Sequence, residues 1–153
     1  MADLTVGSWY ISDVPPDWEV MAGYGIRRTA GFPSVFLFAQ EPMPPEMTLE
    51  KYISKQMDAA RVLFREPKIR DAAVIAIQGA TEARQLGLSW PTADGRQVVQ
   101  IQMYATDGSV VGNATFTTVE QELPHVSEAL HTMMAQLRFL PSPPAAVPGQ
   151  SGR

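Results

Sequence analysis

The stretch Gln97-Val-Val-Gln-Ile-Gln-Met-Tyr-Ala-Thr-Asp-Gly-Ser-Val-Val-Gly-Asn-Ala-Thr-Phe-Thr-Thr118 predicts a long β-hairpin. Asp107-Gly108 is a strong signal for a short hairpin turn. It is flanked by two runs, 97–106 and 109–118, that are rich in the β-branched and aromatic residues of strands. The sequence therefore predicts two antiparallel strands joined by a two-residue loop.

The two faces of this hairpin differ in composition. A two-residue loop would place Ala105 opposite Val110 and Val99 opposite Phe116, and all side chains on that face are apolar. The opposite face mixes apolar groups with amides and hydroxyls, and its members are Val98, Gln100, Gln102, Tyr104, Val111, Asn113, Thr115 and Thr117. We expect the first face to be core, beneath the helices, and the second to face a wetter environment.

Two segments outside the hairpin have the periodicity of helices. The first begins after Thr48, which suits an N-cap, and ends shortly after Arg65, before Pro67. The second has Pro124 near its first turn and ends before Pro141. Both carry apolar side chains at steps of three and four residues, which predicts one buried stripe on each helix.

Two further segments are predicted strands. Residues 34–39 form a short apolar run, and residues 82–90 alternate. In the second segment Leu86, Leu88 and Trp90 lie on one side, and the other side holds Ala83, Gln85, Gly87 and Ser89. We expect this small and polar series to continue the mixed face of the hairpin.

Composition points to one globular domain. The chain has 153 residues, and 12 Lys and Arg against 16 Asp and Glu give a net charge of -4, which argues against a nucleic-acid partner. There is no cysteine, which excludes disulfides, thiolate metal sites and a cysteine nucleophile. We expect a single domain over residues 1–140, followed by a disordered proline-rich tail over residues 141–153.

The N-terminal residues lack the basic and apolar regions of a signal peptide. No stretch approaches the roughly 18 continuous apolar residues of a membrane helix. The sequence therefore predicts a cytoplasmic protein that does not itself insert into a membrane.

Motifs for catalysis are missing from the sequence. His125 and His131 are six positions apart on one predicted helix and do not make a metal pair. No Gly-x-Ser-x-Gly motif and no phosphate-binding glycine loop occur. We expect a protein that is not an enzyme, with no catalytic residues, no cofactor and no bound metal.

Four blocks of sequence carry a family resemblance. They are Val14-Pro-Pro-Asp-Trp18, Glu41-Pro-Met-Pro-Pro-Glu-Met-Thr-Leu-Glu-Lys-Tyr-Ile-Ser-Lys-Gln56, Leu88-Ser-Trp90 with Gln100-Ile-Gln102, and Leu137-Arg-Phe139. With these blocks the chain resembles the DcrB-related proteins (domain of unknown function 1795, DUF1795) of the Mog1/PsbP-like fold, over about residues 8–139. The resemblance implies an α+β sandwich: a curved, mainly antiparallel sheet with helices on one face.

The resemblance also implies a function. The branch of this family without a signal peptide or transit segment includes the effector-associated (Eag) chaperones of type VI secretion, which are cytoplasmic homodimers that hold transmembrane helices of a toxin until export. By this resemblance the chain would shield the hydrophobic N-terminal segment of a secreted effector. A Mog1-like regulatory module for a soluble protein partner is the alternative, and a small-molecule-binding or catalytic domain is a third.

The mixed sheet face is the candidate partner site. It offers small and hydrogen-bonding side chains among apolar ones, as membrane helices offer to one another. Gln56 also interrupts the apolar stripe of the first predicted helix. The expected partner-binding residues are Gln56, Gln85, Val98, Gln100, Gln102, Tyr104, Asn113 and Thr115. The same composition suits an ordinary solvated sheet face, and the sequence alone leaves both interpretations open.

Overall fold

The computed structural model describes residues 2–21 and 23–140. Its strands are β1 (Ala2–Val6), β2 (Trp9–Val14), β3 (Trp18–Met21), β4 (Gly25–Arg28), β5 (Val35–Pro42), β6 (Lys68–Ile69), β7 (Ala73–Val74), β8 (Glu82–Pro91), β9 (Gln97–Thr106), β10 (Val110–Val119) and β11 (Arg138–Phe139). Its helices are α1 (Leu49–Leu63), the short 3-10 helix η1 (Glu120–Glu122) and α2 (Leu123–Gln136). The predicted tail, residues 141–153, lies outside the described residues.

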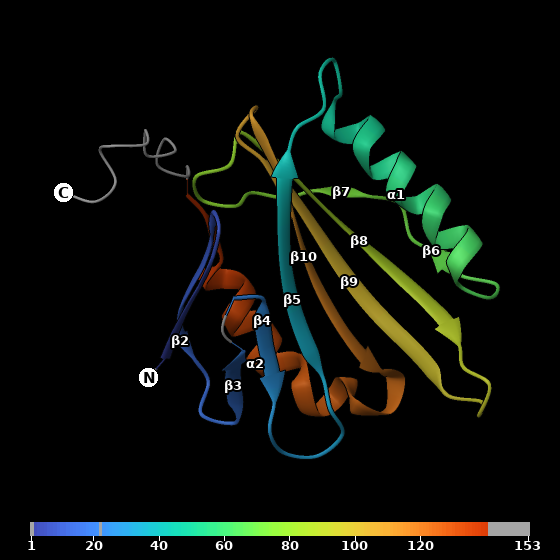
Figure 1. Ribbon diagram of the computed structural model, residues 1–153. Coiled ribbons are helices and arrows are strands. Elements are labelled where there is room, and N and C mark those ends of the chain that lie inside the picture. The colour runs from blue at the N-terminus through green and yellow to red at the C-terminus, as the bar shows by residue number, and fades with distance from the viewer. Residues whose placement is uncertain (1, 22, 141–153) are drawn as a thin grey trace.

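Two antiparallel sheets make up most of the fold (Figure 1). The large sheet has eight strands in the order β3-β4-β5-β10-β9-β8-β6, with β7 also paired to β8, and the small sheet has the order β1-β2-β11. The large sheet is curved (Figure 1). It is also open, because its path of paired strands ends at β3 on one side and at β6 on the other. The predicted α+β class with a mainly antiparallel sheet is confirmed.

The central hairpin is β9 and β10, but its register differs from the prediction by two residues. Thr106 pairs with Val111, so the turn is four residues long. The Asp107 carboxylate stabilises this longer turn by accepting hydrogen bonds from the backbone N–H groups of Ser109 and Val110, each at 2.9 Å. Partial burial raises the pKa of Asp107, but these hydrogen bonds outweigh it and lower the pKa overall. A shift of two residues keeps every side chain on its predicted face.

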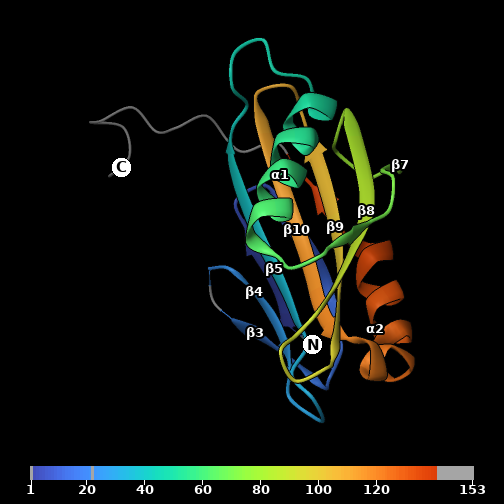
Figure 2. The same cartoon turned by 90° about the vertical axis from the view of Figure 1, so that its right-hand side faces the viewer.

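The two long helices pack on opposite faces of the large sheet, so the expectation that both cover one face is wrong (Figures 1 and 2). The α1 stripe of Leu49, Ile53, Met57 and Ala60 packs against the mixed face of the hairpin. The residues it covers there are Leu86, Leu88, Tyr104 and Val111. These side chains form an apolar area at one end of that face, and α1 shields it from water.

The α2 side of the large sheet holds the main core. Val126, Leu130 and Met133 of α2 belong to a cluster that includes the apolar hairpin face. The small sheet joins this cluster with Trp9 and Phe139, whose rings meet edge to face at 4.9 Å between centroids. The small sheet and α2 together therefore cover the apolar hairpin face that was expected to be core.

Candidate functional site

The α1 side of the large sheet is only partly covered. Figure 2 shows α1 lying over one end of β5, β10, β9 and β8. Beyond the helix, neighbouring side chains from these four strands are half-buried or exposed. We call this set the open strip, and its members are Val35, Leu37, Trp90, Val98, Gln100, Thr115 and Thr117. The open strip contains no charged residue.

Strand register makes the open strip continuous. Thr117 pairs with Val35 on one side and Gln100 on the other, and Val98 pairs with Trp90. Leu37 lies opposite Thr115 and is the most exposed large apolar side chain of the strip, with 40% of its surface accessible. A cavity of about 450 Å³ lies at the end of the strip, where Val98 and Thr117 form part of its lining.

A row of hydrogen bonds runs along β9 from beneath α1 to the open strip. The Tyr104 hydroxyl donates to Gln102 Oε1, Gln102 Nε2 donates to Gln100 Oε1 at 2.5 Å, and Gln100 Nε2 donates to Thr117 Oγ1 at 3.0 Å. Burial raises the pKa of Tyr104 and the nearby Tyr52 raises it further, against a smaller opposite effect of Asn113. The Tyr104 hydroxyl therefore keeps its proton and acts as the donor that begins the row.

The structure brings most of the predicted partner-binding residues onto one face. Val98, Gln100 and Thr115 belong to the open strip, and Asn113 is half-buried beside it, hydrogen-bonded to Thr115 at 2.7 Å. Tyr104 and Gln102 share this face but are buried, with 1% and 8% of their surface accessible, so a partner cannot reach them directly.

The remaining two predicted residues lie elsewhere. Gln56 is half-buried on α1. Gln85 pairs with Met103, which places it on the α2 side of the sheet, so its assignment to the mixed face is wrong. The cause is the register between β8 and β9: it sets Leu86 and Leu88 beside Gln102 and Gln100, and their small and polar neighbours therefore point the other way.

Sequence reasoning missed Val35, Leu37 and Trp90 as surface residues of the site. The first two lie in the run over residues 34–39, in which Phe36 and Phe38 are buried on the opposite face. An apolar run without polar alternation does not reveal which of its residues a neighbouring layer covers. Trp90 stacks on Phe64 at the end of α1, with ring centroids 3.9 Å apart, and this pair forms the border between covered and open surface.

The polar row gives a stability prediction. We expect Gln102→Ala to lower the free energy of unfolding by about 1–3 kcal/mol, because the buried Tyr104 hydroxyl loses the acceptor for its proton. Tyr104→Phe with Gln102→Ala removes both partners and is expected to cost less than Gln102→Ala and Tyr104→Phe added together. Urea denaturation of the four proteins measures this coupling, and strictly additive losses would contradict a linked pair.

The described part of the chain holds no candidate metal group and no membrane-spanning helix. Residues 2–21 and 23–140 contain no group of three His, Asp or Glu side chains that could hold a metal ion. His125 and His131 are both exposed on α2. None of the helices over these residues is long and apolar enough to cross a membrane.

Comparison with known proteins identifies the fold. No family model matches the chain, and no curated protein matches it. LpqN, which is involved in cell envelope biogenesis of Mycobacterium tuberculosis, is similar with a TM-score of 0.65 and 17% identity over 92% of this chain and 90% of LpqN. PA94 from Pseudomonas aeruginosa, a protein of unknown function, is similar with a TM-score of 0.65 and 21% identity over 88% of this chain and 90% of PA94. The chain therefore has the same fold as these two proteins.

Proposed function

We propose that this chain is a non-enzymatic binding protein that holds an apolar segment of a partner protein on the open strip. The observation that carries the proposal is an uncharged surface that spans β5, β10 and β9, that α1 leaves uncovered and that Trp90 of β8 borders. Contiguous apolar patches on soluble proteins commonly mark interaction sites. The hydroxyl and amide groups of the strip can form hydrogen bonds with water when no partner is bound.

The chemistry of the open strip favours a helical apolar segment as the occupant. Helices that pack without a hydrophobic driving force use close contact and side-chain hydrogen bonds, which Thr115, Thr117 and Gln100 can supply. Val35, Leu37 and Val98 supply the apolar contacts between them. The cavity at the end of the strip offers space for one large side chain of the segment.

At a finer level we propose a cytoplasmic chaperone or adaptor that shields transmembrane helices of a type VI secretion effector before export. The support is the resemblance to DcrB-related proteins, because the third of the four blocks that carry it supplies Trp90 and Gln100 to the open strip. LpqN is described as involved in cell envelope biogenesis and PA94 as a candidate regulator, and both descriptions suit a binding protein.

The partner complex is proposed to contain two copies of this chain. One open strip covers one side of a bound helix, and a second copy would cover the other side. Light scattering of the purified complex should therefore give the mass of two chains plus the bound segment. A complex with a single copy of this chain would contradict the shared site.

Co-expression tests the proposed function directly. The probe is a soluble carrier protein fused to a Leu/Ala-rich helix of about 20 residues, the length of a membrane span. The matched control carries a Gly/Ser segment of the same length. We expect the apolar fusion to stay in the supernatant after ultracentrifugation and to co-purify with this chain, whereas the control does not co-purify.

Two results would overturn the proposal. Equal retention of both fusions would show that the chain binds the carrier, and no retention of the apolar fusion would show that the open strip does not hold such helices. In the second case a soluble partner without apolar segments, as for a Mog1-like regulatory module, becomes the better explanation.

A further inference from the structure

A second cavity lies on the opposite, α2 side of the large sheet, away from the open strip. Its volume is about 590 Å³, within the range of small-molecule sites. It forms because α2 and the small sheet cover only part of this face. The part of β8 and β9 that lies near η1 is left uncovered. Gly87 contributes to the space: it pairs with Ile101 and has no side chain to fill the gap.

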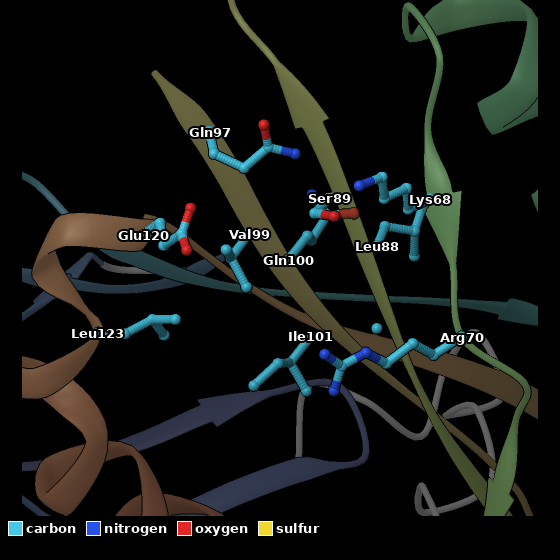
Figure 3. Close-up of a pocket in the computed structure, with 11 residues that line it drawn as sticks. Lys68, Arg70, Leu88, Ser89, Gln97, Val99, Gln100, Ile101, Glu120 and Leu123 are labelled. Carbon is cyan, nitrogen blue, oxygen red and sulfur yellow. The ribbon is translucent and has the colours of Figure 1, made fainter. Parts of the chain in front are cut away.

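The cavity has an apolar floor and one cationic wall (Figure 3). Val99 and Ile101 lie at its centre, with Leu123 of α2 at one side. Lys68 and Arg70 lie on the opposite side, and Figure 3 shows the Arg70 side chain reaching toward Ile101. Neither cation forms an ion pair with any residue that the structure describes.

Strand alternation explains why both cations face the cavity. Lys68 pairs with Ser89, and the backbone N–H of Arg70 donates to the Gly87 carbonyl at 2.9 Å. Positions 87 and 89 of β8 both face the α2 side of the sheet. Residues paired across neighbouring strands face the same side, so the Lys68 and Arg70 side chains lie on the α2 side as well. Ile69 between them points to the other face and packs with the α1 cluster. Backbone pairing with β8 at the edge of the sheet therefore holds Lys68 and Arg70 in place.

We propose that this cavity binds a small amphipathic monoanion: a carboxylate with an apolar body. The carboxylate would lie against Arg70 and Lys68, since a guanidinium can bind a carboxylate through two parallel hydrogen bonds. The apolar body would lie on Val99 and Ile101 and extend toward Leu123. Glu120 on the α2 side leaves the lining with one excess positive charge, which a single negative charge neutralises.

This site is independent of the proposed function, because it lies on the other face of the sheet. Decanoate is the probe, and decanol and decyltrimethylammonium are its neutral and cationic counterparts. Calorimetry on the full chain should show decanoate binding at least tenfold more tightly than either counterpart. Backbone NMR signals of Val99, Ile101 and Leu123 should shift with decanoate, whereas those of Leu37 and Thr115 should not.

Three variants make the test specific. Lys68→Gln with Arg70→Gln should weaken decanoate binding at least tenfold, and Gly87→Leu should abolish it by filling the cavity. The matched control is Lys51→Gln with Lys55→Gln, which makes the same change of charge on exposed positions of α1 and should leave the affinity unchanged. Melting curves check that each variant is folded.

Several outcomes would overturn the proposal. One is decanoate binding no more tightly than decanol, and another is equal weakening by the cavity and control pairs, which would indicate a general charge effect. NMR shifts confined to the open strip would place the ligand on the α1 side of the sheet instead of in the cavity. A chain that binds decanoate but fails to retain the apolar fusion would keep this site and reject only the proposed function.

Discussion

Replacement of Gly112 by alanine is expected to lower the free energy of unfolding by about 3 kcal/mol, the upper part of the usual range for overpacking a core. An added Cβ would lie 2.6 Å from Phe139 Cε1 and 2.7 Å from Trp9 Nε1. Both rings are fully buried, and the Trp9 Nε1–H donates to the Ala39 carbonyl at 3.0 Å. Neither ring can move aside without losing packing or this hydrogen bond.

Gly87 provides the matched control for this prediction. It is also a strand glycine, but a Cβ there would meet its nearest atom, Arg70 Cδ, at 3.8 Å, an ordinary contact. Gly87→Ala should leave stability unchanged or raise it slightly, because alanine loses less conformational freedom on folding than glycine. Urea denaturation of both variants measures the difference. Equal stability of the two would show that the Trp9–Phe139 layer is not rigid.

The central features of this fold could be predicted from local sequence patterns. The Asp107-Gly108 turn between alternating runs predicted β9 and β10, and the stripe after Thr48 predicted α1. The Thr48 side chain caps that helix by accepting a hydrogen bond from the Lys51 N–H at 3.1 Å. These elements depend on interactions within a few residues, which is why pattern and structure agree.

Features that depend on contacts distant in sequence could not be predicted in the same way. The pairing of β8 with β9 decides whether Gln85 or Leu86 lies beside Gln102, and no local pattern determines it. The short strands β6 and β11 have two residues each and carry no periodicity. Their positions follow from the partners that they meet in the folded chain.

The candidate site was predicted in part. Alternation along β9 correctly placed Gln100 and Gln102 on one face, opposite Met103. Whether a residue on that face is covered depends on the length and direction of α1, which leaves Gln100 accessible and buries Gln102. The exposure of Leu37 could not be predicted from its apolar neighbours in sequence, because it depends on α1 ending before it covers this part of β5.

The open strip gives the prediction with the largest effect on binding. Leu37→Glu with Val98→Glu is expected to weaken retention of the apolar fusion by more than 100-fold, which corresponds to roughly 2.7 kcal/mol of binding free energy. A bound helix would press both carboxylates against its apolar side chains, and desolvating charges in an apolar contact is costly. Leu37 is exposed and Val98 is half-buried, so the variant should stay folded, which its melting curve checks.

The matched control is Val62→Glu with Leu63→Glu at the end of α1. These two apolar side chains are 86% and 76% exposed, and the change adds the same charge outside the open strip. Affinity for the fusion helix, measured by calorimetry with the helix in mild detergent, should stay within a few-fold of wild type. If the control pair loses binding and the strip pair keeps it, the helix binds at the end of α1, and the occupied surface is the exposed Val62–Leu63 pair rather than the sheet.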